Sequence, residues 1–256
     1  MESLYSAIRQ KNTRLFSTSL AALGDINYIP EGEDRSALHL SIDLGFHQGT
    51  WHLFRHPSLR IEDLYDVPNI MILASEAAPL DVVKKIARNP LVPVHYDWYN
   101  GEDSALTPPI HHRDLVRYKW LLYLRGDEFD IGNTVETCEA ATDLSVESYD
   151  EFLTLALKFS EDPVKTKQEL ALELEPERSA ACIYSLVIFD CDGLLRVSAE
   201  NAGTSASRFF SVAAKLPMEL QMLLCNRLCG IAHDNIPSKL SEPAFKDIAQ
   251  DFRVSF

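Results

Sequence analysis

The sequence predicts an all-α fold: a solenoid of about four helical repeats over residues 1–159, packed on a helical C-terminal domain over residues 160–256. Segments that open with a small polar residue and continue apolar begin at Ser36, Asn69 and Ser104, so they recur at intervals of 33 and 35 residues. After the last two openings, a run with apolar residues at helical spacing begins eleven residues later. Such a period is typical of solenoids, in which each repeat buries its apolar face against its neighbours.

The starting repeat is expected to be degenerate, because terminal repeats have one face without a neighbour. It covers residues 1–27 and carries an apolar stripe made of Leu4, Ala7, Ile8, Leu15, Leu20 and Leu23. In the units that follow, Asn69 and Ser104 are expected to cap the first helices, since their side-chain oxygens accept hydrogen bonds from free backbone amides.

The later units are less regular in sequence. Pro108 and Pro109 stand inside the opening of the third unit and are expected to distort its first helical turn. A weaker fourth unit is predicted over residues 133–159, with Phe152, Leu155 and Phe159 on its apolar stripe.

The opening at residues 36–41 carries a resemblance to a known family. A small polar residue followed by Ala37, Leu38 and His39 resembles the threonine–proline–leucine–histidine opening of ankyrin repeats, which have two antiparallel helices and a finger loop about every 33 residues. Gly45 stands where that family turns between its helices, whereas residues 77–79 and 112–114 lack the corresponding glycine. The resemblance covers the first 159 residues and implies a protein-binding scaffold or adaptor, not an enzyme.

Ankyrin-type solenoids bind partners through their finger loops and the concave face of the first helices. Here the finger segments 25–35 and 92–103 mix aromatic residues, which dominate interface hot spots, with acidic ones. An aromatic anchor in an acidic rim suits a basic segment of another protein. We expect at least one of the four finger aromatics, Trp98 before the others, to be part of the core. The predicted partner-binding residues are Tyr28, Glu31, Glu33, Asp34, Tyr65, Asp66, Tyr96, Asp97, Trp98, Tyr99, Glu102 and Asp103.

The amino-acid composition and the net charge disfavour some classes of binding partner. The net charge of −14 and a pI near 5.0 disfavour nucleic acid and anionic membranes, which the acidic surface would repel. No stretch approaches the roughly 18 apolar residues of a membrane span. The five cysteines lack CxxC pairs and the histidines lack metal-ligand spacing, so we expect no disulfides, metal or cofactor. A cytoplasmic or nuclear location is expected.

The C-terminal hundred residues lose the period. Ser160 is expected to cap a helix that ends before Pro176, and residues 198–207 to form a loop. The apolar run 180–189 fits a buried strand or a buried helix, and beside a helical solenoid we favour the helix. Two further helices are expected: a short one over residues 242–252, and an earlier one starting near Pro217 whose inward stripe is Leu216, Leu220, Leu223, Leu224 and Leu228. The stretch is similar to C-terminal extensions of some fungal-type ankyrin proteins of unassigned role.

Residues 187–195 raise an enzymatic alternative. Asp190 and Asp192 have the spacing of the first motif of haloacid-dehalogenase-type phosphatases, an apolar strand ending in Asp-x-Asp-Gly. That resemblance implies a nucleophile, an acid/base and Mg²⁺. We favour a buried segment closed by Gly193, because only 64 residues follow Asp192 and they show no further strands of that family.

A second alternative concerns residues 216–252. The opening Leu216-Pro217-Met218-Glu219-Leu220 resembles that of an F-box, the helical module that docks ubiquitin-ligase scaffolds. This resemblance implies a substrate adaptor whose repeats hold the substrate. Leucines at this spacing also occur in any buried helix, so a plain packing helix stays the preferred interpretation.

Overall fold

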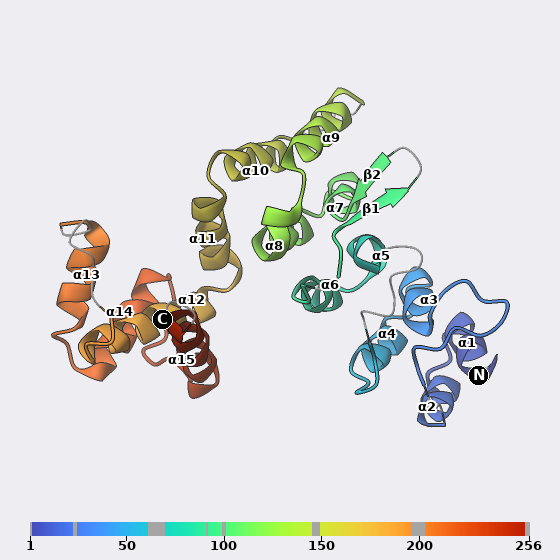
Figure 1. Cartoon of the computed structure of the whole chain (residues 1–256), viewed down its shortest axis with the longest axis horizontal. Helices are drawn as coiled ribbons and strands as arrows, with labels where there is room; N and C mark the ends of the chain where they lie inside the picture. The colour runs from blue at the N-terminus through green and yellow to red at the C-terminus, as the bar shows by residue number, and fades with distance from the viewer. Residues whose placement is uncertain are drawn as a thin grey trace. The chain divides into compact units, whose positions relative to one another are not determined.

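The computed structural model describes residues 2–22, 25–60, 70–90, 92–98, 101–144, 149–195 and 203–253, and it confirms the all-α class (Figure 1). In these ranges every regular element is helical except one two-stranded hairpin. None of the described helices is long and apolar enough to cross a membrane. The chain divides into two compact units, unit 1 (Met1–Lys167) and unit 2 (Gln168–Phe256), inside helix α11 (Pro163–Leu174) and C-terminal to the predicted boundary at residues 159/160.

Unit 1 is built from successive helix pairs, five of them in its described residues. They are α1 (Glu2–Arg9) with α2 (Thr13–Ala21), α3 (Ala37–Asp43) with α4 (His47–Phe54), α5 (Ile70–Ala77) with α6 (Leu80–Ala87), α7 (Thr107–His111) with α8 (Leu115–Arg125), and α9 (Ile131–Leu144) with α10 (Asp150–Glu161). The first helices contact one another in order along α1, α3, α5, α7 and α9. The second helices contact one another at α2 with α4 and along α6, α8 and α10. The pairs therefore stack in chain order, as Figure 1 shows.

The repeat spacing predicted for the second helices is confirmed. They begin at His47, Leu80 and Leu115, which are 33 and then 35 residues apart. The first helices begin at Ala37, Ile70 and Thr107, so the last of them starts later than its predicted opening at Ser104. Two strands, β1 (His95–Trp98) and β2 (Gly101–Ser104), occupy the chain just before it.

Three of the turns within pairs share one geometry. Lys11, Gly45 and Arg113 have φ of 49°, 63° and 56°, the left-handed region that favours glycine. The residue after each donates its N–H back across the turn: Asn12 to the Ala7 oxygen at 2.9 Å, Phe46 to Ser41 at 2.8 Å and Asp114 to Pro109 at 2.8 Å. Gly45 thus turns the chain as predicted, and at the other two turns a basic residue adopts the conformation that glycine would have provided.

Neither of the two predicted caps, Asn69 and Ser104, is confirmed, and the opening residue that does cap a first helix is Ser36. Ser36 caps α3, because its Oγ accepts from the His39 N–H at 3.3 Å and lies 2.7 Å from His39 Nδ1. Ser104 does not cap α7. Leu106 takes the N-cap position, and the Ser104 Oγ accepts from the Leu106 N–H at 3.2 Å. Pro108 falls in the first turn of α7, where no N–H is required, so the five-residue helix accommodates it. Asn69 lies outside the described residues.

The atypical ends of unit 1 still bury apolar stripes. In α1, Leu4, Ala7 and Ile8 are buried, while Leu15 and Leu20 of α2 are half-buried and Leu23 is outside the described residues. Phe16 of α2, which the predicted stripe omitted, is fully buried and packs edge-on against Phe46 at 5.4 Å. At the other end Phe152 and Phe159 of α10 are buried as predicted, and Leu155 is half-buried.

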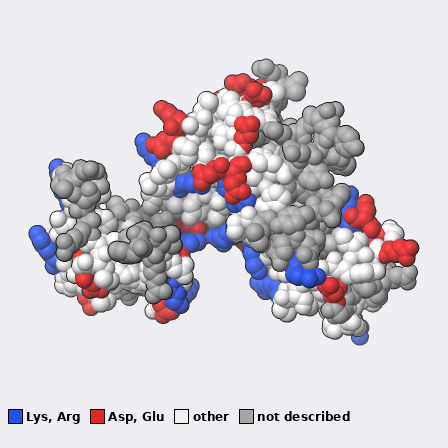
Figure 2. Space-filling model, in the orientation of Figure 1, with Lys and Arg blue, Asp and Glu red and all other residues white. Residues whose placement is uncertain are grey.

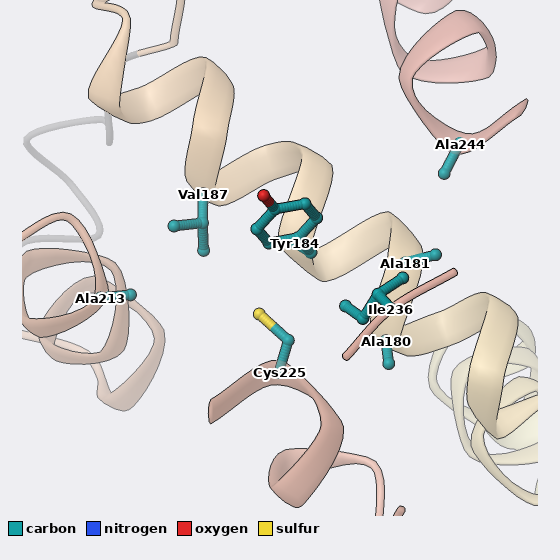
Figure 3. Packing of buried hydrophobic residues seen from close by; sticks show 8 residues of the cluster. All are labelled: Ala180, Ala181, Tyr184, Val187, Ala213, Cys225, Ile236 and Ala244. Atoms are coloured by element: carbon teal, nitrogen blue, oxygen red, sulfur yellow. The ribbon is translucent and has the colours of Figure 1, made fainter. Parts of the chain in front are cut away.

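Unit 2 is organised around one long helix, α12 (Pro176–Cys191). It contacts α13 (Ser205–Ala213), α14 (Met218–Leu228) and α15 (Ser238–Arg253). Figure 3 shows Tyr184 and Val187 of α12 facing Cys225 of α14 in the buried cluster. The apolar run 180–189 is therefore a helix, which confirms the favoured prediction.

Three details of the C-terminal prediction were wrong. Ser160 lies within α10, and Asp162 caps α11 by accepting from the Lys165 N–H at 3.0 Å. The predicted loop 198–207 ends earlier than expected, since Thr204 caps α13 through the Ser207 N–H. The leucine stripe of α14 faces inward only in part: Leu224 packs against the buried cluster, whereas Leu220 and Leu228 are 46% and 57% exposed.

Polar side chains account for the orientation of α14. Gln221 donates to the Ala213 carbonyl at 3.1 Å, and Asn226 donates to the carbonyls of His233 at 2.8 Å and Asn235 at 3.3 Å. Both side chains are nearly fully buried. A buried amide without partners costs free energy, so these bonds favour turning this face inward and leave Leu220 and Leu228 outside.

Candidate functional site

The loop between α2 and α3, the first finger (residues 25–35), is anchored by the helix beneath it. The Tyr5 hydroxyl of α1 donates to the Arg35 carbonyl at 3.0 Å and lies 3.5 Å from the Tyr28 carbonyl oxygen. Burial, followed by the charge of Glu33, raises the pKa of Tyr5, so the hydroxyl stays protonated and can donate. The backbone of the finger is thereby held at two points.

A second set of bonds ties the first finger to the following loop. The Asn27 side-chain amide donates to the Ser58 carbonyl at 2.7 Å, and its oxygen accepts from the Arg60 N–H at 2.9 Å. The Asp25 carboxylate accepts from both the backbone and side-chain N–H groups of Asn27 at 2.9 Å, and these bonds hold the pKa of Asp25 below its ordinary value. Neighbouring fingers are thus joined through one asparagine.

The tip of the first finger exposes an aromatic ring beside acidic groups. Tyr28 is 48% exposed, Glu31 is exposed, and the side chain of Asp34 is 85% exposed. Figure 2 shows acidic side chains over this loop. Glu33 is paired more closely than Asp34, whose carboxylate lies 3.9 Å from Nε of Arg35: both Glu33 carboxylate oxygens lie 2.6 Å from Nη2 of Arg9, so its charge is already compensated within the chain. Sequence reasoning missed this pairing because Arg9 belongs to another element.

The third finger is the β1–β2 hairpin. Its antiparallel register pairs Tyr96 with Asp103 and Asp97 with Glu102, so the backbone places aromatic and acidic positions opposite acidic ones. The flanking residues Val92, Val94, Ala105 and Leu106 are buried. The ring of His95 at the base contacts the Glu128 carbonyl oxygen and packs edge-on on Phe129 at 5.7 Å. The hairpin is therefore rooted in unit 1 on both sides.

Several predicted site residues cannot be placed at the side-chain level. Tyr65, Asp66 and Tyr99 lie outside the described residues. Only the backbone is described for the hairpin residues Tyr96, Asp97, Trp98, Glu102 and Asp103. The prediction that Trp98 is part of the core therefore concerns a side chain outside the described part of the structure.

A hollow lies at the foot of the hairpin, between the first helices α5 and α7. It has a volume of about 410 Å³. Its lining residues are Ile72, Glu76, Ser104, Thr107, Pro108, His111 and His112. Glu76 is exposed and is the one charged residue of α5. The sequence could have indicated Glu76, because it is a single charge in an otherwise apolar helix.

The two aspartates of the phosphatase-like motif end a helix. Asp190 belongs to the last turn of α12, Asp192 is its C-cap, and Gly193 follows with φ of 69°. The described residues of unit 2 contain no strand that could present them to a phosphate. The C-terminal end of a helix also carries partial negative charge, which disfavours an anionic ligand.

Metal-binding clusters and disulfides are absent from the described part of the chain. No group of three or more His, Cys, Asp or Glu side chains in it could hold a metal ion. None of the five cysteines forms a disulfide. Burial raises the pKa of Cys138 to about 11 and that of Cys225 to about 12, so these thiols behave as small apolar residues.

Comparisons of the chain with models of protein families, with characterised proteins and with solved structures found no match.

Proposed function

We propose that the chain is an ankyrin-type repeat protein that binds a basic segment of another protein through its finger loops and the row of first helices. The stacked pairs of unit 1, the shared turn geometry and the Ser36–His39 contact support the repeat assignment. Solenoids of this kind present an extended surface that binds without catalysis.

The first finger carries the functional part of the proposal. Its backbone is fixed by Tyr5 and Asn27, while Tyr28, Glu31 and Asp34 face solvent. A loop that is already ordered loses little conformational entropy on binding, and this strengthens the complex. Exposed carboxylates around an aromatic ring suit a partner with Arg or Lys beside an apolar residue.

Neutralising the acidic fingers tests this proposal. The finger variant combines Glu31→Gln, Asp34→Asn, Glu102→Gln and Asp103→Asn, and it leaves Glu33 in place because Glu33 pairs with Arg9. The probe is a short fluorescein-labelled peptide of Arg, Lys and Leu, followed by stopped-flow anisotropy at several salt concentrations. We expect association to slow by about fivefold or more and to lose much of its salt dependence.

A matched control separates a local site from the general negative charge. Its substitutions are Glu161→Gln, Asp192→Asn, Glu219→Gln and Glu242→Gln, which remove the same number of charges at exposed positions elsewhere. Exposed substitutions usually change stability by less than about 0.5 kcal/mol each, so both variants should fold. Equal slowing in the two variants would contradict a finger site.

One observation favours a second candidate, an F-box-like adaptor acting through residues 216–252. Met218, Leu220 and Leu228 on α14 are 57%, 46% and 57% exposed, although leucines at this spacing would be expected in a core. An exposed apolar helix face is typical of a docking surface.

The adaptor candidate is tested with a purified ubiquitin-ligase scaffold subunit. The variant Leu220→Ser with Leu228→Ser should abolish its binding and leave unfolding unchanged, because neither side chain is buried. Val164→Ser in α11, at a position that is 67% exposed, is the control. If the wild-type chain does not bind the scaffold, the adaptor candidate is wrong.

A further inference from the structure

The second helices of unit 1 carry a cationic surface on an otherwise acidic protein. Arg55 follows α4, Lys84 and Lys85 lie in α6, and Arg88 follows α6. We call these four residues the outer cation face. Figure 2 shows Lys and Arg atoms over α6 and the end of α4. In a chain with a net charge of −14, such a local excess of positive charge needs a physical reason.

Three of these cations lie over aromatic rings. The Lys84 ammonium lies 3.7 Å from the Trp120 ring centroid, Lys85 lies 4.5 Å from that of Phe54, and Arg55 lies 4.6 Å from that of Trp51. Among the described residues, none of these three cations takes part in an ion pair. A cation over a ring keeps most of its charge available to an incoming anion.

A hollow opens within this face, between the end of α4 and the end of α6. Its volume is about 480 Å³, within the range of sites that hold a small group of side chains. It is lined by Phe54, His56, Leu59, Lys85, Arg88, Asn89 and Pro90. Among the described residues, the lining combines apolar groups with basic ones and contains no carboxylate.

We propose that the outer cation face binds an acidic, partly apolar segment of another protein. The carboxylates of that segment lie over Lys85 and Arg88, and an apolar side chain enters the hollow against Phe54 and Leu59. This site is distinct from the acidic fingers and takes a partner of the opposite charge. The chain would therefore hold two segments at once, a basic one at the fingers and an acidic one at the second helices.

An acidic peptide fits this surface better than nucleic acid does. Nucleic acid carries charge along its whole length, so the part of a strand that extends beyond the outer cation face lies close to acidic surface and is repelled. A short segment meets only the local field, which is screened from distant carboxylates beyond about 8 Å at physiological salt.

The test uses a short fluorescein-labelled peptide of Glu, Asp and Leu as probe, with the full-length chain titrated by anisotropy. The site variant is Lys85→Glu with Arg88→Glu, and the matched control is Lys165→Glu with Arg208→Glu. Both controls are exposed and lie on other elements, and both variants change the net charge equally. We expect the site variant to weaken binding at least about tenfold and the control to weaken it by less than about twofold.

Further arms identify the ligand and check the fold. A peptide of Glu and Asp without Leu should bind more weakly than the probe, because it leaves the hollow empty. Circular dichroism must show the same helicity in both variants, and Lys85→Ala, which removes charge without repulsion, should weaken binding in the same direction.

Four outcomes would overturn the proposal. They are no binding of the probe, equal loss in site and control variants, tighter binding of a single-stranded oligonucleotide than of the peptide, and a wild-type dimer in sedimentation that the site variant dissociates. The last would make this face a contact between copies of the chain.

Discussion

The two units of this molecule bury their cores in different ways. In unit 1 each helix pair contacts the pairs before and after it, so the buried stripe extends along the chain. In unit 2 one helix, α12, contacts α13, α14 and α15, and these contacts join distant parts of the sequence. In the first arrangement loops connect the successive pairs, whereas in the second α12, α13, α14 and α15 contribute to one cluster.

The difference has a consequence for local stability. A stacked array depends on contacts between neighbours, so its terminal pair has a neighbour on one side and opens most easily. A helix surrounded by three others opens only when the cluster does. We therefore expect a substitution in unit 1 to lower stability mainly around the substituted residue. A substitution in unit 2 should lower the stability of the whole unit.

The largest difference between the two units is expected in the rate at which their buried thiols are labelled. Cys138 lies in the terminal pair of unit 1 and Cys225 in the cluster of unit 2, and both are buried. With pKa values of about 11 and about 12, their thiolate fractions at pH 8 are about one in a thousand and one in ten thousand. We expect exposed Cys191 to react first, and Cys138 to react before Cys225 as urea is raised. Reaction of Cys225 before Cys138 would reverse the assigned order of opening.

The pKa values of the same two thiols predict how the stability of each unit changes at alkaline pH. A folded-state pKa above the ordinary 9.0 means that the neutral thiol stabilises the fold below pH 9. This contribution is lost as the pH rises through about 11 for Cys138 and about 12 for Cys225. Urea midpoints measured from pH 8 to 11 should fall for wild type and fall less for Cys138→Ala.

Removal of one buried arginine should destabilise unit 1 alone. Arg125 is 4% exposed and donates to the carbonyls of Asn89 at 2.9 Å and Val92 at 2.8 Å, at the root of the hairpin finger. Arg125→Ala removes the guanidinium bonds to both carbonyls, of which that of Asn89 also accepts from the Val92 N–H at 3.2 Å, and should cost about 3 kcal/mol of unfolding free energy. All three tryptophans lie in unit 1, so tryptophan fluorescence in urea reports this loss.

The control for Arg125 is Arg14→Ala, an exposed side chain of α2, which should change stability by less than about 0.5 kcal/mol. Hydrogen exchange of peptides from unit 2 should be the same in wild type and in Arg125→Ala. Faster exchange there would show that the two units unfold together.

The smallest expected effect on stability comes from substituting two glycines, one in each unit, so the two units can be compared directly. Gly45 ends α3 in unit 1 and Gly230 follows α14 in unit 2, with φ of 63° and 72°, and an added Cβ at either position meets no atom within 4 Å. Each alanine variant should therefore cost only the backbone strain, about 1 kcal/mol, in its own unit. Lys11→Gly should stabilise unit 1 by a similar amount. A cost well above this for Gly45 alone would indicate packing that the turn geometry does not show.

The periodic features of the fold were the predictable ones. Helical spacing and the 33- and 35-residue intervals identified the second helices, and the apolar run 180–189 was assigned to a helix because of its helical neighbours. The turn at residues 112–114 was predicted, but its left-handed conformation and that of Lys11 were not, because lysine and arginine do not favour this conformation as glycine does. The hairpin at residues 95–104 was missed as well, since its strands are four residues long and polar.

The candidate site was predictable in type but not in detail. The composition of the fingers indicated acidic, aromatic loops, and the exposure of Tyr28, Glu31 and Asp34 agrees with that prediction. The pairing of Glu33 with Arg9 and the outward face of α14 depend on contacts between elements. Local patterns contain no information about such contacts, so only a structure provides them.

The central claim is that the fingers of unit 1 hold a basic partner. Hydrogen exchange of the full-length chain, with and without the Arg, Lys and Leu peptide, tests it most directly. We predict slower exchange on peptide binding in residues 25–35 and 95–104, smaller slowing in α5 and α7, and no change in unit 2. Slowing confined to unit 2, or to residues 47–60 and 80–90, would contradict the claim.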